Sequence, residues 1–135
     1  MEAIDHSLII IEDEPLIAMM IGEIAEDLGW TVEGSACTEA DGFLLLDSSV
    51  PKLALLDINL GLTNSFAIAA SCRDRGIPVV FITGYMARDF PRECGDAPIL
   101  AKPFSSDDLE KALWQAITRN SAPAKQALGA GSGAR

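Results

Sequence analysis

The chain has 135 residues, a length that fits a single domain. Apolar residues make up 49% of it and charged residues 22%, which is typical of a folded globular protein and excludes a disordered chain. The 20 acidic and 10 basic residues give a formal net charge of -10. Because so acidic a chain repels a polyphosphate backbone, we expect no nucleic acid among its partners.

The apolar runs, the first residues and the cysteines exclude several further classes of protein. The apolar runs are too short to span a bilayer, and the first six residues lack the basic and apolar segments of a signal peptide. We therefore expect a cytoplasmic protein without membrane contact. Cys37, Cys72 and Cys94 form no Cys-x-x-Cys pair and His6 is the only histidine, which excludes a zinc finger and a histidine-based metal site.

Short apolar runs alternate with segments of helical periodicity along the chain. The predicted strands are Ser7 to Ile11, Trp30 to Ala36, Leu53 to Leu56, Val79 to Ile82 and Ile99 to Ala101. The predicted helices are Pro15 to Leu28, Thr38 to Leu46, Ser65 to Arg75 and a last one that begins after Ser105 and ends near Ile117. Five strands that alternate with helices predict an α/β protein with a parallel sheet covered on both faces.

Residues with known capping preferences mark several helix ends. Gly29 and Gly76 fit the left-handed position that follows a helix. Capping boxes are indicated by the pairs Thr38 with Asp41 and Ser105 with Asp108.

Two segments of the chain have little periodicity. Residues 85–97 hold two clusters of charged and proline residues, so a fourth helix there would be short or irregular. Gly, Ala, Ser and Pro dominate the last 15 residues. We expect one domain over residues 1–119 and a disordered tail over residues 120–135.

Polar residues follow four of the five predicted strands directly. They are Glu12 and Asp13, Asp57, Thr83 and Lys102. In open α/β sheets, ligands bind at the carboxyl edge of the strands, at the point where the strand order reverses. Neighbouring strands lie about 4.8 Å apart, so Asp13 and Asp57 can share one ion if the first and third strands are neighbours.

The clustered carboxylates suggest a cation, because two of them at 4 Å repel each other by about 4 kcal/mol at an effective dielectric constant near 20. Mg²⁺, for which Mn²⁺ can substitute, prefers oxygen ligands. The ammonium of Lys102 and the hydroxyl of Thr83 would complete a cradle for a phosphoryl group. Asp57, at its centre, can act as the nucleophile.

The order Glu12-Asp13, Asp57, Thr83 and Lys102-Pro103 resembles the receiver domains of bacterial two-component response regulators, over roughly residues 7–119. The resemblance implies a flavodoxin-like sheet of strand order 2-1-3-4-5. It also implies that the protein is no enzyme but a response regulator, in which Asp57 accepts a phosphoryl group from a histidine kinase or a histidine phosphotransfer protein. Because only about 16 residues follow the last predicted helix, we expect a single-domain regulator or a relay intermediate, or a receiver cut from a larger chain. The output would be binding to a downstream protein.

The resemblance also implies individual roles for the residues of the site. Asp13, Asp57 and the backbone carbonyl of Asn59 would ligate Mg²⁺ directly, whereas Glu12 would act through water. Thr83 and Lys102 would contact the phosphoryl oxygens. The peptide bond between Lys102 and the following proline would be cis.

Two features depart from the family pattern. Ile99 occupies the position three residues before the lysine where receivers usually have an aromatic switch residue, and only 18 residues separate Thr83 from Lys102. The run Phe81-Ile82-Thr83-Gly84-Tyr85, with Lys102-Pro103-Phe104, instead resembles a subgroup of stand-alone alphaproteobacterial receivers with a Phe-Ala-Thr-Gly-Tyr-like motif. Tyr85, Pro103 and Phe104 are therefore candidates for switch or partner contacts. Residues 85–97 would move or become ordered on phosphorylation.

Other functions remain open at this point. A phosphohydrolase with an aspartyl nucleophile is one, although haloacid-dehalogenase-like enzymes need an acid where this chain has Asn59. A flavin carrier is another, although Glu12-Asp13-Glu14 would repel the flavin phosphate. A docking pseudo-receiver that is never phosphorylated is the third.

Overall fold

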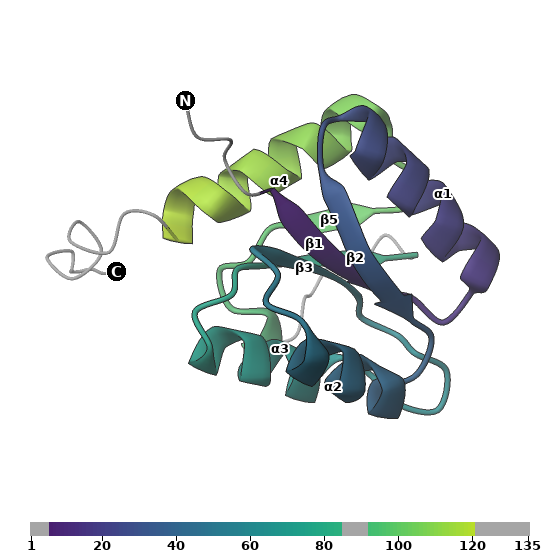
Figure 1. The fold of residues 1–135 in the computed structure, drawn as a ribbon, viewed down its shortest axis with the longest axis vertical. Coiled ribbons are helices and arrows are strands. Elements are labelled where there is room, and N and C mark those ends of the chain that lie inside the picture. The colour runs from purple at the N-terminus through teal and green to yellow at the C-terminus, as the bar shows by residue number, and fades with distance from the viewer. Residues whose placement is uncertain (1–5, 85–91, 121–135) are drawn as a thin grey trace, which may run out of the picture.

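Five parallel strands form the centre of the computed structural model, which describes residues 6–84 and 92–120 (Figure 1). The strands are β1 (Ser7–Ile11), β2 (Thr31–Ala36), β3 (Leu53–Asp57), β4 (Val79–Thr83) and β5 (Ile99–Ala101). Their order in the sheet is β2-β1-β3-β4-β5, and every neighbouring pair is parallel. The flavodoxin-like topology expected from the sequence is confirmed.

Two helices cover each face of the sheet. The helices α1 (Pro15–Asp27) and α4 (Ser106–Asn120) lie on one face, and α2 (Glu39–Ser48) and α3 (Phe66–Asp74) lie on the other (Figure 1). Within residues 6–84 and 92–120, no helix combines the length and the apolar character needed to cross a lipid bilayer. Asn120 belongs to α4, and the rest of the expected tail lies outside the described residues.

The described residues between β4 and β5 contain one turn of 3₁₀ helix, η1 (Arg92–Cys94), and no α-helix. This agrees with the short or irregular helix that the sequence predicts there. Residues 85–91, with Tyr85, lie outside the described residues. The expected movement of residues 85–97 on phosphorylation therefore stays a prediction.

The helix ends follow the capping residues in the sequence. The Thr38 hydroxyl accepts a hydrogen bond from the Asp41 N–H (3.1 Å) at the start of α2. At the start of α4, the Ser105 hydroxyl accepts from the Asp108 N–H and the Asp108 carboxylate accepts from the Ser105 N–H, which is a complete capping box. Gly29 follows α1 with φ = 97°, a left-handed conformation that a residue with a side chain rarely adopts.

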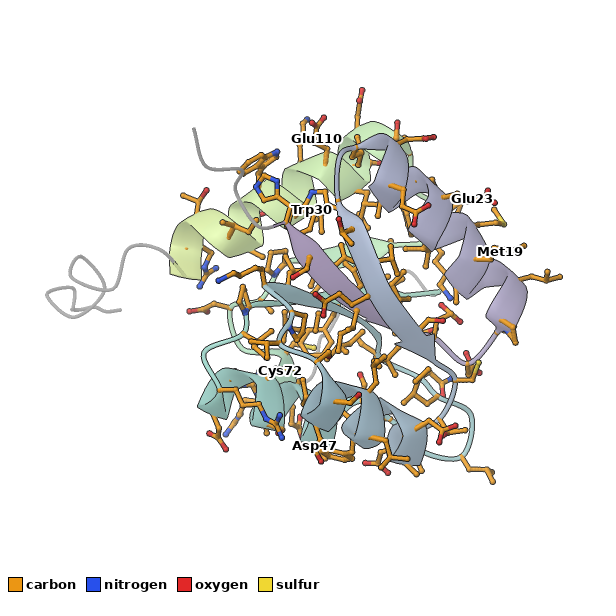
Figure 2. The ribbon with its side chains drawn as sticks, in the orientation of Figure 1. Met19, Glu23, Trp30, Asp47, Cys72 and Glu110 are labelled. Carbon is orange, nitrogen blue, oxygen red and sulfur yellow. The ribbon has the colours of Figure 1, made fainter. Side chains whose placement is uncertain are left out.

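The sheet separates two apolar cores, because successive side chains of a strand point to opposite faces. Every residue of β1, β3 and β4 is buried, as expected for the central strands of a parallel sheet. Figure 2 shows Cys72 on α3, which belongs to one of these cores, whereas Met19 and Glu23 lie on the outer side of α1. The polar residues that end the buried strands are therefore clear exceptions to an apolar pattern.

Strand register places those polar residues at one edge. Ile11 lies opposite Leu56, so that Glu12 and Asp57 follow at the same level. Thr83 lies opposite Ala101, and Lys102 comes next in the chain. Four strands that end in line thus present an acid, an acid, a hydroxyl and an amine to the same side of the sheet.

Candidate functional site

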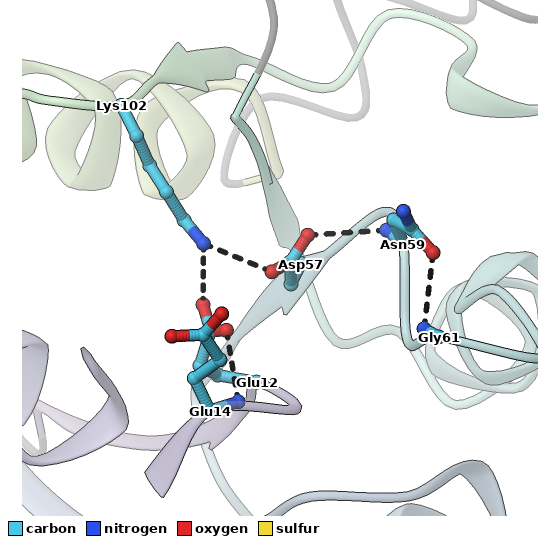
Figure 3. A network of polar contacts seen from close by, with 6 residues as sticks. All are labelled: Glu12, Glu14, Asp57, Asn59, Gly61 and Lys102. Atoms are coloured by element: carbon cyan, nitrogen blue, oxygen red, sulfur yellow. Dashed lines mark hydrogen bonds and ion pairs between the residues drawn. The ribbon is translucent and has the colours of Figure 1, made fainter. Parts of the chain in front are cut away.

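Lys102 joins two acidic residues at the carboxyl edge of the sheet. Its Nζ lies 2.9 Å from Oε1 of Glu12 and 3.0 Å from Oδ2 of Asp57 (Figure 3). Because β4 lies between β5 and β3, the lysine side chain crosses the end of one strand to reach them. The site therefore draws on β1, β3 and β5 together.

Glu12 is an acid with no exposed surface. Its Oε2 accepts a hydrogen bond from the backbone N–H of Glu14 (3.2 Å). Its buried Oε1 has the ion pair with Lys102 but, among the described residues, no hydrogen bond of good geometry. Burial raises the pKa of Glu12 to about 7, an effect that Lys102 opposes and that the charge of Asp57 increases. Ionised Glu12 is thus left with a buried oxygen that lacks a full set of partners.

Asp57 is nearly as buried, with 4% of its surface exposed. Its Oδ2 binds Lys102, and its Oδ1 accepts a hydrogen bond from the backbone N–H of Asn59 (3.1 Å). The Asn59 side chain in turn accepts from the N–H of Gly61 (3.0 Å), so the loop after β3 is fixed by two short turns (Figure 3). This loop holds the carboxylate of Asp57 toward the other strand ends.

Lys102 is partly buried, and its surroundings favour the charged form. Burial by itself lowers the pKa of this ammonium, but the contacts with Glu12 and Asp57 outweigh burial and raise the pKa above its usual value. The Lys102–Pro103 peptide bond is cis, as expected, and the Lys102 N–H donates to the carbonyl of Thr83 (2.8 Å). The backbone turn and the two acids together fix the position of the amine.

Three carboxylates at this edge fit a hard divalent cation. Glu12, Asp13 and Asp57 each offer one oxygen, and these oxygens lie within 4.8 Å of one another. Three carboxyl groups face the single ammonium of Lys102, so the cluster has an excess of negative charge when all three are ionised. An all-oxygen donor set with a buried oxygen that lacks a hydrogen bond suits Mg²⁺.

The other predicted site residues differ in how close they come to this cluster. Thr83 is buried at the end of β4, and its backbone carbonyl accepts the hydrogen bond from the Lys102 N–H. Pro103 is exposed, whereas Phe104 is half-buried and packs against the core below α1 and α4. Ile99 is half-buried against the opposite core, so the usual switch position holds an aliphatic packing residue. Tyr85 lies outside the described residues.

Two contacts of the site were not predicted from the sequence. The ion pair between Lys102 and Glu12 joins residues that the sequence analysis assigned to a phosphoryl group and to a metal ion. The second contact is made by the backbone N–H of Glu14, and no side-chain pattern reveals such a donor. The three acids and one amine at strand ends, Glu12, Asp13, Asp57 and Lys102, were the available signal for the first contact.

The comparison with known families agrees with this geometry. A family model described as the response regulator receiver domain matches residues 8–114. The chain belongs to this family. Receiver domains are signalling domains of bacterial two-component systems, and they typically bind Mg²⁺ at an acidic site such as the one described above.

Curated relatives of this receiver domain include two bacterial regulators. The phyllosphere-induced regulator PhyR of Methylorubrum extorquens is 36% identical over 114 residues, which cover 82% of this chain and 43% of PhyR. The transcriptional regulatory protein PdtaR of Mycobacterium tuberculosis is 29% identical over 121 residues, which cover 87% of this chain and 59% of PdtaR. The chain thus spans about half the length of the curated relatives it matches.

Solved structures show the same fold. The solution structure of SdrG from Sphingomonas melonis Fr1 superposes with a TM-score of 0.74 and 36% identity, covering 83% of this chain and 95% of SdrG. The crystal structure of PhyR from Brucella abortus gives a TM-score of 0.76 and 31% identity, covering 92% of this chain and 52% of that one. These neighbours fit the alphaproteobacterial subgroup that the sequence motif resembles.

Proposed function

We propose that this receiver domain accepts a phosphoryl group on Asp57 from the phosphohistidine of a histidine kinase or a histidine phosphotransfer protein, and that it signals by binding a downstream protein. One observation carries the proposal. The Oδ2 atom of Asp57 lies 3.0 Å from the Lys102 ammonium, and Glu12 and Asp13 each offer an oxygen within 4.8 Å of an oxygen of Asp57. Phosphoryl transfer depends mostly on positioning and charge neutralisation, and this arrangement supplies both.

The transfer step uses residues at the ends of three strands. A carboxylate oxygen of Asp57 attacks the phosphorus atom, an O–P bond forms, and the N–P bond to the donor histidine breaks. The imidazole keeps the electron pair of that bond and holds a proton. Lys102 then contacts the phosphoryl oxygens with its ammonium, and Thr83 donates a hydrogen bond to them from the neighbouring strand end.

Four residues would hold the divalent cation. These are Asp13, Asp57 and Asn59, the last through its backbone carbonyl, with Glu12 acting through water. When bound, Mg²⁺ or Mn²⁺ supplies positive charge that neutralises the phosphoryl oxygens. The chain itself positions the carboxylates. The backbone N–H of Asn59 binds Asp57, and the ion pair with Lys102 holds Glu12.

Phosphorylation by acetyl phosphate tests the proposal on the full chain. With Mg²⁺, we expect the intact mass of the wild type to increase by one phosphoryl group, and we expect no increase in EDTA. Asp57→Asn should abolish the increase. Asp107→Asn, which changes an exposed aspartate on α4, is the matched control and should be labelled like the wild type. Unchanged labelling of the Asp57→Asn protein would contradict the proposal.

A phosphatase assay on the same proteins separates the two chemical alternatives. A receiver should hydrolyse its own aspartyl phosphate slowly and should release no phosphate from small phosphate esters with multiple turnovers. Rapid, Asp57-dependent turnover of such esters would support a phosphohydrolase instead.

We also propose that residues 1–119 suffice for labelling by acetyl phosphate, and that residues 120–135 are a dispensable tail.

A further inference from the structure

The positive charges of this acidic protein are unevenly distributed. The structure describes four of the chain's arginines, Arg73, Arg75, Arg92 and Arg119. Arg73 is in the last turn of α3, Arg75 directly follows that helix, Arg92 is in η1 and Arg119 is near the end of α4. The ends of α3 and η1 lead into the amino ends of β4 and β5, and α4 runs from the carboxyl end of β5 back along the sheet. All four arginines therefore lie at the edge of the sheet opposite Asp57.

Three of these arginines line one cavity of about 590 Å³, which we call the arginine cavity. They are Arg73, Arg92 and Arg119, and they come from α3, η1 and α4. Apolar side chains form much of the remaining wall, among them Ile77, Pro78, Val79, Ala97, Pro98 and Ala116. The volume lies within the range of roughly 300–1,000 Å³ that is typical of small-molecule sites.

Contacts with the segment before β5 position two of the guanidinium groups. Arg73 donates a hydrogen bond to the carbonyl of Glu93 (3.3 Å). Arg119 donates to the carbonyl of Asp96 and forms an ion pair with the carboxylate of the same residue (3.2 Å). A guanidinium has five N–H donors, and the hydrogen bond from Arg73 to Glu93 uses one of them.

The charge at the cavity favours an anion of limited size. Its lining has three arginines, Arg73, Arg92 and Arg119, against two acidic residues, Glu93 and Asp96. The Asp96 side chain is 86% exposed, so solvent weakens its ion pair with Arg119. The net charge of -10 repels a long polyanion, which cannot place all of its phosphates in one cavity.

We propose that the arginine cavity binds a phosphorylated small molecule of nucleotide size. Guanidinium groups match phosphate oxygens with paired hydrogen bonds, and the apolar wall accepts the uncharged part of the ligand. The site lies at the opposite edge of the sheet from Asp57, so its ligand does not compete with the phosphoryl group. The inference therefore goes beyond the proposed function and stands without it.

Nuclear magnetic resonance of the ¹⁵N-labelled full chain in EDTA tests the proposal, with ADP and inorganic pyrophosphate as probes. EDTA removes any divalent cation, so Asp57 and its neighbours take no part. We expect saturable shifts of the backbone amides of Gly76, residues 93–97 and Arg119. ADP should bind several-fold more tightly than pyrophosphate, because the apolar wall contacts the nucleoside.

Two arginine variants distinguish specific binding in the arginine cavity from nonspecific attraction of the anion to positive charge. Arg92→Gln should weaken ADP binding about tenfold, the loss expected for a hydrogen bond between charged groups. Arg75→Gln removes the same charge from the same edge, but Arg75 binds Asp47 and the Leu46 carbonyl outside the cavity, so the affinity should stay within about twofold. The spectra of both variants without ligand verify that they are folded.

The same data can overturn the proposal. Absence of saturable shifts, shifts centred on Lys102, or equal losses in Arg92→Gln and Arg75→Gln would each contradict a specific anion site. Equal affinity for ADP and pyrophosphate would contradict the nucleotide-sized ligand. None of these results depends on whether Asp57 is phosphorylated, so failure here is distinguishable from failure of the proposed function.

Discussion

Glu12 is a fully buried acid at the carboxyl edge of the sheet. Acidic side chains are almost never fully buried without a partner, and Glu12 has Lys102 as a partner that it shares with Asp57. One ammonium cannot neutralise two carboxylates and the nearby Asp13 as well. The electrostatics of the metal-free protein thus favour a proton on Glu12 or a cation beside it.

The raised pKa of Glu12 gives a pH dependence with a definite sign. Its pKa is about 7 in the folded protein against 4.5 for an ordinary glutamate, so the folded state binds the extra proton between these values. The stability that Glu12 contributes is therefore complete below pH 4.5 and is lost as the pH rises through 7. From pH 6 to pH 8 this loss should be about 1 kcal/mol in the free energy of unfolding.

Urea denaturation in EDTA at pH 6 and pH 8 measures this effect. Relative to Glu12→Gln, which cannot ionise, the wild type should lose about 1 kcal/mol between the two pH values. Glu14→Gln, a change in an exposed neighbour, should keep the pH dependence of the wild type. The explanation fails if the wild type and Glu12→Gln respond to pH equally.

At the scale of the elements, the helix caps differ in a way that stability can detect. The Thr38 hydroxyl caps α2 by accepting a hydrogen bond from Asp41. Ser65 occupies the equivalent position before α3, but its hydroxyl is buried and has no hydrogen-bond partner within residues 6–84 and 92–120. The hydroxyl of Thr38 thus caps a helix, whereas the hydroxyl of Ser65 caps none in the described structure.

Alanine substitutions should reveal this difference. Thr38→Ala should lower the free energy of unfolding by about 1 kcal/mol, the usual loss for a missing N-cap. Ser65→Ala removes a buried hydroxyl that makes no hydrogen bond in the described part of the chain, so it should leave the stability unchanged or raise it slightly. Urea denaturation of both variants provides the comparison, and an equal loss in the two would show that Ser65 has a partner after all.

On the scale of the whole molecule, much of the fold could be predicted because the physical signals were local. Buried strands read as apolar runs, and Gly29, Thr38 and Ser105 marked helix ends through their own backbone preferences. The strand order could not be predicted in this way, and it was expected only from the resemblance to a family. No short-range pattern in the chain encodes it.

The site and the arginine cavity differ in how far the sequence could predict them. The site residues follow buried strands, so the rule for parallel sheets brings them to one edge. Arg73, Arg92 and Arg119 lie at the ends of unlike elements, and only the folded backbone brings them to one cavity. The pairing of Lys102 with Glu12 likewise depends on a side chain that crosses β4.

Chemical trapping of the modified residue tests the central claim most directly. An aspartyl phosphate is reduced by borohydride to homoserine, so peptide mass spectrometry after treatment with acetyl phosphate and Mg²⁺ locates the phosphoryl group. We predict homoserine at position 57 of the full chain, and none when Mg²⁺ is replaced by EDTA. Reduction at Asp13 or at any other aspartate in place of Asp57 would contradict the account.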